Sequence, residues 1–552
     1  MTEKAATAFD SRLTMKRERK AESLGIPLSA LAIPLLLGIF LLITSTRYLS
    51  STLALFDVKR MIEIMIFGAI LAIAIIDPRL RMELVAQFRR IPRWIGLGLV
   101  GFIGLGVVSS VFNAASPFAL AYSLADVYLL AIMIVLTLVV AACRSIAGTR
   151  FDQLVMFCLA MLGLAVGVQE LIGVAVAWSA GLQFSYDVAL THFSHARFYN
   201  QLQSWTVPLL TALPVVFSRH RLAALPCILV LGLHWYILLM TGARGSTLSL
   251  LVAFGVTLLL FPGARRLIIK WQAAGILLGV LIYILMFLGP ATGHHPIDTA
   301  TALPVPVSDG VAVEENPGTA GLPGETPTAI ANRYFKLSLG RPMLHSSGRL
   351  KLWSTALGYA EENPLLGIGP MNFACTGPFF FAGHPHNSAM QLLSEWGLPA
   401  TLLALGILLT LLGCLVTRLR VPVAPPPEQW LLQVMLFTSV LAAILHSGLS
   451  GLLIMPASQV AAVLVCGWLL GSINSTETRV IDSPAEDKVF HYRSASTPIL
   501  IISLMATLML WLFAIHEIKN MNHYEKQIPA IEWGTPRFWN SGKVCSLHMQ
   551  PE

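Results

Sequence analysis

The chain has 552 residues, of which 55% are hydrophobic and 12% are charged, and its mean hydropathy is +0.71. Soluble domains carry about 25% charged residues, so this composition excludes an ordinary soluble protein and is typical of a polytopic membrane protein. The formal net charge of +8 does not indicate nucleic-acid binding. Most Lys and Arg of the short connections fall on one predicted side of a membrane, as the positive-inside rule describes.

Long apolar runs recur along the chain and predict an all-α, polytopic helical bundle of about 12–13 transmembrane helices. A transmembrane helix needs about 20 mostly apolar residues and a barrel strand needs about 10, and the runs have the length of helices. The predicted spans cover residues 26–46, 61–76, 95–114, 123–142, 154–177, 203–217, 222–241, 246–261, 271–288, 397–417, 431–452, 458–473 and 499–515.

The first segment, residues 1–25, is polar and basic, and no small-residue cleavage site follows the first predicted span. We therefore predict a cytoplasmic basic tail and a first span that is retained as an anchor. Nine spans then fill residues 26–288, with the N-terminus in the cytoplasm.

A basic stretch follows the second predicted span. The basic residues that follow it are Arg79, Arg81, Arg89, Arg90 and Arg93. Their number marks this connection as cytoplasmic and sets the direction of the later spans.

Two arginines stand at the outer ends of predicted spans. Arg197 precedes the sixth span in SHARFYNQ, and Arg244 lies in the short turn TGARGS between the seventh and eighth spans. One interpretation is an interfacial arginine whose head group reaches water. The other is a pyrophosphate clamp, because a guanidinium can bind phosphate with two hydrogen bonds and the glycines beside Arg244 leave the backbone open.

The longest connection, residues 289–396, lies outside by this topology. Its first part, to about Pro327, is rich in Pro and Gly and predicts a poorly ordered loop. The apolar spacing of SGRLKLWSTALGYAEENP then predicts an amphipathic helix that ends at Asn363-Pro364. Spans ten to thirteen occupy residues 397–515, and a tail of residues 516–552 follows outside.

The segment GHPHNSAM ends the long connection and holds two histidines. A histidine before a span can be an interfacial residue, or it can act as a general base. Because His384 and His386 are two residues apart around Pro385, an extended backbone would point them to opposite faces, so only one would face a given pocket.

Among seven cysteines, only Cys375 and Cys545 lie outside by this topology. They form a candidate disulfide in an oxidising compartment, and two free thiols are the equal alternative because spacing gives no geometry. No Cys/His spacing typical of zinc occurs, so no metal site is predicted.

Residues 190–420 resemble the O-antigen ligase and O-antigen polymerase superfamily. The most specific part is HPHNSAMQLLSEWGLPATLLALG, in which a His-Asn pair precedes a Leu-rich helix and a glycine. The matching residues are His386, Asn387, Leu392, Leu393, Glu395 and Gly397, with an upstream lead-in of Arg349, Trp353, Pro364, Gly367 and Gly369. ARFYNQ and GARGSTLSL resemble the two outer arginine sites of the same family.

The resemblance implies a multi-pass enzyme of the bacterial inner membrane whose active site faces the periplasm. Such enzymes move a glycan from undecaprenyl pyrophosphate to an acceptor hydroxyl, with inversion and without metal or cofactor. His386 would be the catalytic base, while Arg197, Arg244, Arg349 and Asn387 would bind substrate. The partners implied are the lipid-linked glycan donor, membrane lipid, and an acceptor that is lipid A–core, a glycan or a protein.

We expect lipid A–core as acceptor, which would make the chain an O-antigen ligase. A polymerase of O-antigen or exopolysaccharide and an O-oligosaccharyltransferase are the alternatives, and the 37-residue tail argues mildly against the protein-glycosylating class. A transporter or flippase is a more distant alternative, because Asp126 and Glu170 fall inside predicted spans.

Overall fold

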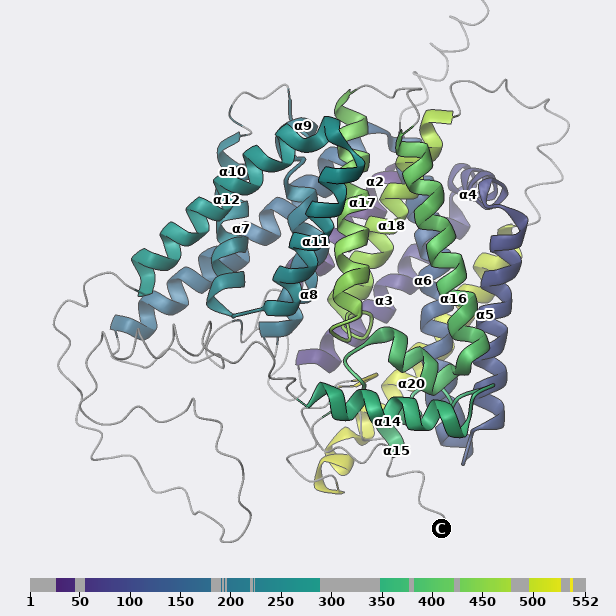
Figure 1. Ribbon diagram of the computed structural model, residues 1–552. Helices are drawn as coiled ribbons and strands as arrows, with labels where there is room; N and C mark the ends of the chain where they lie inside the picture. Colours follow the sequence, from purple (N-terminus) through teal and green to yellow (C-terminus); the bar gives the residue numbers. More distant parts are fainter. Residues whose placement is uncertain are drawn as a thin grey trace, which may run out of the picture.

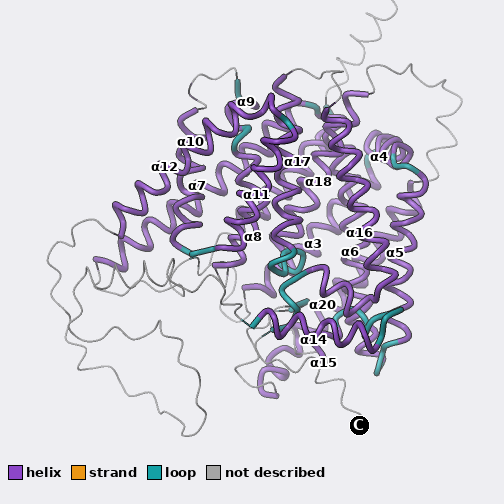
Figure 2. Tube along the Cα trace, in the orientation of Figure 1, coloured by secondary structure: helices purple, strands orange, loops and turns teal. Residues whose placement is uncertain are grey.

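The computed structural model describes residues 26–44, 55–179, 190, 193, 196–218, 222, 224–287, 348–376, 382–420, 427–477, 496–527 and 537–539. Long helices run side by side as a bundle (Figure 1). Figure 2 shows helices joined by loops, and no strand occurs among the described residues, which confirms the all-α prediction.

The elements follow one another without any soluble domain between them in the described ranges. They are α2 (Leu28–Ile43), α3 (Leu55–Ile76), α4 (Pro78–Arg90), α5 (Arg93–Phe112), α6 (Pro117–Ala147), α7 (Thr149–Ser179), α8 (Ala196–Leu210), α9 (Leu213–Val216), α10 (Ala224–Met240), α11 (Arg244–Leu260), the 3-10 turn η3 (Pro262–Ala264), α12 (Arg265–Phe287), α14 (Arg349–Glu362), α15 (Asn372–Thr376), α16 (Ser388–Arg420), α17 (Pro427–Ser447), α18 (Pro456–Glu477) and α20 (Ser496–Gln527).

Each of the thirteen predicted spans falls on a helix, but the helices differ in their ability to cross a membrane. Within the described residues, eight helices are long and apolar enough, or nine if the bent pair α3 and α4 is one span. Three apolar helices, α2, α10 and α11, are shorter. The predicted span 203–217 is divided, because α8 ends at Leu210 and a turn precedes α9.

The chain bends by 100° between α3 and α4. Asp77 caps α4, because its Oδ1 accepts hydrogen bonds from the backbone N–H groups of Arg79 at 2.8 Å and Leu80 at 3.3 Å, and Pro78 occupies the first helical position. Proline fits there because its missing N–H would have no partner in a helix. Four of the five basic residues after the second predicted span, Arg79, Arg81, Arg89 and Arg90, therefore lie on the separate helix α4 at one end of the bundle, and Arg93 begins α5 (Figure 1).

Small residues allow two helix pairs to pack closely, as is common between membrane helices. A Cβ at Gly467 of α18 would stand 2.6 Å from the Thr137 carbonyl oxygen of α6. In the pair formed by α10 and α12, a Cβ at Gly279 would stand 2.7 Å from Cβ of Trp235. These glycines bring the helix backbones together and leave no room for a larger side chain.

The predicted amphipathic helix is confirmed as α14, which lies with α15 at the end of the bundle opposite α4 (Figure 1). The next helix, α16, begins at Ser388, nine residues before the predicted boundary, and bends at Gly397, where φ is +81°. The bend leaves the Leu398 N–H directed at the Pro364 carbonyl oxygen at 2.8 Å. At the far end, α20 continues to Gln527, so helix extends into the predicted tail 516–552.

Candidate active site

His384 and His386 lie together immediately before α16. The backbone N–H of His386 donates a hydrogen bond to Nδ1 of His384 at 3.1 Å, and the ring centroids are 4.2 Å apart. The expectation that the two rings face opposite sides is wrong, because His386 adopts φ of +55° instead of an extended conformation. A non-glycine residue in this region is uncommon and costs free energy, so the surroundings must hold it.

His384 is the buried member of the pair, and its ring lies against the turn between α17 and α18. A Cβ at Gly451 of that turn would stand 2.7 Å from Nε2 of His384, so only glycine leaves room for the ring. Burial lowers the pKa of His384 well below its ordinary range, and electrostatic interactions with His386 and Arg537 lower this pKa further. His384 is therefore neutral near pH 7 and accepts a hydrogen bond through Nδ1.

His386 is only partly buried, and its ring lies next to the start of α16. Asn387 caps that helix, because its Oδ1 accepts from the backbone N–H groups of Ala389 at 3.0 Å and Met390 at 3.1 Å. Asparagine is among the best residues for this role. Its capping function fixes where His386 stands relative to α16, while a contact of Asn387 with substrate stays a prediction.

The helix α14 supports the histidine segment from the side. Trp353 Nε1 donates to the Pro385 carbonyl oxygen at 3.0 Å, between the two histidines. Beneath it, Leu352 and Phe373 pack in a small apolar cluster with Ala382. Arg349 begins this helix, and partial burial lowers the pKa of its guanidinium. A partly desolvated guanidinium binds an anion more strongly than one in bulk water.

Arg197 and Arg244 both stand in the first turn of a helix and both have exposed side chains. The starts of these helices are joined, because Asn200 Nδ2 donates to Thr241 Oγ1 at 2.7 Å. Gly242 has φ of +56°, which turns the chain sharply before Arg244. Exposed arginines beside helix N-termini fit the predicted role of binding a phosphate-bearing ligand.

His446, which we did not predict from the sequence, connects the arginine helices to the rest of the site. It lies near the end of α17, and its Nδ1 is 2.8 Å from Ser204 Oγ of α8 while its Nε2 is 3.3 Å from Ser246 Oγ of α11. Arg349 is close enough to interact electrostatically with it. Its signal in the sequence is weak, since the run around it is apolar and only the following Ser-Gly marks a turn.

The turn between α17 and α18 brings the two groups of residues together. Gln201 of α8 donates through Nε2 to Ser450 Oγ at 2.7 Å, and the next residue, Gly451, contacts the His384 ring. Segments that are far apart in the sequence thus meet around one short turn. The predicted base and the predicted arginine-bearing helix α8 therefore share one end of the bundle.

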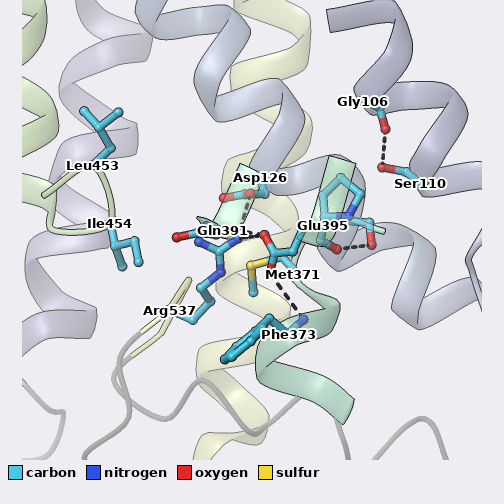
Figure 3. Close-up of polar contacts among 12 residues, drawn as sticks. Gly106, Ser110, Asp126, Met371, Phe373, Gln391, Glu395, Leu453, Ile454 and Arg537 are labelled. Carbon is cyan, nitrogen blue, oxygen red and sulfur yellow. Dashed lines mark hydrogen bonds and ion pairs between the residues drawn. The ribbon is translucent and has the colours of Figure 1, made fainter. Parts of the chain in front are cut away.

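A second group of residues, which we also did not predict as a unit, surrounds the buried Arg537. Its Nη2 is 2.5 Å from Glu395 Oε2 and 3.2 Å from Asp126 Oδ2. Figure 3 shows the guanidinium between these carboxylates, with Gln391 beside it. When the Gln391 amide is oriented with its oxygen toward Arg537, that oxygen accepts from Nη2 at 2.6 Å.

The two acidic residues that suggested a transporter have partners at this end of the molecule. Asp126 pairs with Arg537, and Glu170 Oε1 accepts from the Leu190 backbone N–H at 3.0 Å. These contacts give each carboxylate a structural explanation. A transport role has no other observation in its favour among the described residues.

Of the two cysteines in the candidate disulfide, the structure describes only Cys375. Cys375 is disulfide-bonded, whereas the other five cysteines among the described residues are free thiols. Cys545 lies outside the described residues, so the pairing of Cys375 with Cys545 stays a prediction. Peptide mapping of the non-reduced protein by mass spectrometry is the direct measurement, and recovery of Cys545 as a free thiol would contradict the pairing.

Comparison with known proteins adds a finding of its own. A family model described as O-antigen ligase matches residues 227–405, about a third of the chain. The matched range includes Arg244, Arg349, His386 and Glu395 and excludes Arg197 and Arg537. No curated protein matches the chain.

Proposed function

We infer that the chain is a multi-pass membrane protein with a lipid-linked glycan ligase- or polymerase-type function, because residues 227–405 match a family model described as O-antigen ligase and eight or nine spans among the described helices are long and apolar enough to cross a membrane. The enzyme transfers a glycan from undecaprenyl pyrophosphate to the hydroxyl of lipid A–core, which makes it an O-antigen ligase. Transfer to another lipid-linked glycan, as a polymerase, or to a protein hydroxyl is the second candidate, and the family match supports the polymerase as well.

One observation supports the proposal most strongly, and that is the meeting of the His384–His386 segment with the arginine-bearing helix α8 at one turn. His384 contacts Gly451, and the neighbouring Ser450 is bonded to Gln201 of α8. A base and guanidinium groups that lie at the same bundle end can act on one bound donor. A random set of interfacial residues would have no reason to converge in this way.

The chemistry assigned to each group follows from its position. His386 takes the proton of the acceptor hydroxyl as the O–H bond breaks, and the oxygen forms a bond to the anomeric carbon of the donor sugar. The bond from that carbon to the pyrophosphate oxygen breaks on the opposite face, so the product has inverted configuration. Arg197, Arg244 and Arg349 stabilise the negative charge that develops on the departing undecaprenyl pyrophosphate.

Neutral His384 would not compete for this proton transfer. Its low pKa keeps the ring neutral. Because Nδ1 accepts a hydrogen bond from the His386 backbone N–H, Nδ1 is the unprotonated nitrogen of that neutral ring. The neighbouring histidine therefore orients the backbone of the base. A protonated His384 would lose that acceptor and release His386.

The charge pattern supports an orientation with the site facing the periplasm. The basic helix α4 lies at the opposite end of the bundle from α14 (Figure 1). By the positive-inside rule, the basic helix α4 would lie at the cytoplasmic face of the inner membrane. The histidine segment, at the other end of the bundle, would then lie at the periplasmic face. Labelling an introduced cysteine on α14 with a membrane-impermeant reagent would test this.

The decisive experiment is transfer by the purified full-length protein. Undecaprenyl-pyrophosphate-linked glycan is supplied with lipid A–core, with a pilin-like protein, or with no other acceptor. We expect product only with lipid A–core. Elongated lipid-linked glycan in the last sample would instead identify a polymerase, and the absence of any product from active donor would reject the transferase.

A further inference from the structure

The C-terminal segment Arg537-Phe538-Trp539 is buried against the bundle and has no role in the proposed reaction. Arg537, Phe538 and Trp539 are 3%, 2% and 1% exposed, although all three lie beyond the last helix. Arg60 of α3 donates through Nε to the Phe538 carbonyl oxygen at 3.2 Å. The Phe538 ring lies against Tyr122 and Phe513. The segment is thus held from three sides by helices of the bundle.

Arg537 contacts the first two turns of α16, the helix that carries the histidine segment. Glu395 and Gln391 are four residues apart, and the Gln391 N–H donates to the carbonyl oxygen of Asn387 at 2.9 Å. Asn387, Gln391 and Glu395 therefore lie on one face of the helix. Arg537 binds Gln391 and Glu395 and so holds this face of α16 in place. The first residue of the face, Asn387, caps α16 and is the neighbour of His386 in the chain.

Glu395 also joins this helix to the turn before it. Its Oε1 accepts from the Phe373 backbone N–H at 3.2 Å, and its carbonyl oxygen accepts from Gly369 at 2.9 Å. Its side chain is fully buried, and a buried carboxylate that loses its cationic partner is strongly destabilising. By compensating the buried charge of Glu395, Arg537 therefore allows Glu395 to connect α15 to α16 through these hydrogen bonds.

We infer that Arg537 is a positioning residue of the transferase site. By pairing with Glu395 and Asp126 it holds the start of α16, and with it the His384–His386 segment in which His386 has a left-handed conformation. The inference rests on the proposed function for the part that concerns glycan transfer. It makes the C-terminal segment, which lies outside the matched family range, a component of the active site.

A charge effect accompanies the positional one and offers a readout that packing alone would not change. Two groups interact electrostatically with His384, namely His386 from its own segment and the Arg537 guanidinium from the tail, and the carboxylates of Glu395 and Asp126 flank Arg537. Removal of the Arg537 charge raises the pKa of His384. His384 then becomes protonated, and loses its Nδ1 acceptor, at a higher pH than in the wild type.

The test compares Arg537→Gln and Arg537→Lys with Arg144→Gln in the purified full-length protein. Arg144 forms an equally buried pair with Asp152, at the other end of α6. Diethyl pyrocarbonate modification of His384 and His386, read by mass spectrometry across a pH series, needs no catalysis. Steady-state transfer to the accepted acceptor is measured in parallel.

We expect Arg537→Gln to increase the modification rate of His384 about tenfold, because a local opening exposes the ring. Its transfer kcat should fall with little change in KM, and the acid limb of kcat should move to higher pH. Arg537→Lys should keep the wild-type acid limb, since it keeps the charge, with a partial loss of kcat. Arg144→Gln should leave the His384 rate within about twofold of wild type.

Equal His384 modification in Arg537→Gln and Arg144→Gln would overturn the inference. If Arg537→Gln does not fold, Glu395→Gln decides by the same labelling, because it keeps the acceptor for Phe373 but removes the ion pair. Unchanged His384 modification in that variant would also overturn it. Failure of the wild type to transfer glycan would instead reject the proposed function and leave the labelling result valid.

Discussion

Two buried arginines at opposite ends of α6 form similar ion pairs with different consequences. Arg144 binds Asp152 with both Nε and Nη2, at 2.5 and 2.8 Å, across the tight turn from α6 to α7. Trp468 Nε1 also donates to that carboxylate at 2.6 Å. Arg537 instead divides its guanidinium between carboxylates that are 142 and 411 residues away. The first pair fastens one turn, and the second exists only when the bundle has assembled.

The difference separates stability from chemistry. A local pair forms as soon as two adjacent helices meet, so its loss should weaken the fold without changing the geometry of a distant site. A pair between remote segments acts where those segments meet, which here is the start of α16, directly after the segment of His384 and His386. Variants that alter the residues at one end of the bundle and leave those at the other end intact test this difference.

The largest effect should come from His386→Ala at the site end. Removing a general base typically costs about 10²–10⁴ in rate, so transfer should nearly disappear while the thermal unfolding temperature stays close to wild type. His384→Ala should be milder, because His384 orients the base and does not accept the proton. Transfer assays with purified protein measure both, and near-normal activity of well-folded His386→Ala would reject the assignment.

The next effect concerns Arg197 and Arg244, the arginines proposed to bind phosphate. Arg197→Ala and Arg244→Ala should each lower kcat by about 10²–10³, as expected for loss of one group that stabilises the developing charge. Arg244→Lys should recover only part, because lysine lacks the forked geometry. Arg265→Ala, at the start of α12 and beyond the far end of α11, is the matched control. Full activity of both Arg197→Lys and Arg244→Lys would show that the two arginines act only as charges.

A smaller effect is expected from Gly451→Ala. The new methyl group would collide with the His384 ring, and overpacking of this kind costs about 1–3 kcal/mol. We expect about tenfold slower transfer, with His386 displaced and the rest of the bundle unchanged. Gly255→Ala on α11, where a Cβ meets open space, is the control. Equal activities of the two variants would argue against the importance of the His384 contact.

The smallest effect on activity should follow Arg144→Gln. The variant leaves Asp152 buried without its cation, which typically destabilises a fold by about 3–5 kcal/mol. The unfolding temperature should fall, while transfer per folded molecule and the pH profile should match wild type. Intrinsic fluorescence during heating and active-fraction kinetics measure the two quantities. A specific loss of kcat here would remove the contrast between the two ends.

Much of the fold could be predicted because it depends on local composition. Apolar runs of about 20 residues must be helical in a membrane, and all thirteen predicted runs are. The boundaries were less accurate, as α16 begins before its apolar run and α20 continues beyond its own. Polar ends such as these become helical through caps and tertiary contacts, here the Asn387 cap, which hydropathy does not register.

The candidate site also combines features that could be predicted from neighbouring residues with features that depend on tertiary contacts. The sequence by itself determined an all-α membrane bundle with a His-Asn motif at one end, because spans and caps depend on neighbouring residues. Only the tertiary structure decided that His384 and His386 contact each other, since His386 takes a left-handed conformation that an extended-chain prediction excludes. It also decided that His446 and Arg537 contact the helices of the candidate site, because their partners lie on remote helices and the free energy of such pairs depends on burial, which only the assembled bundle creates.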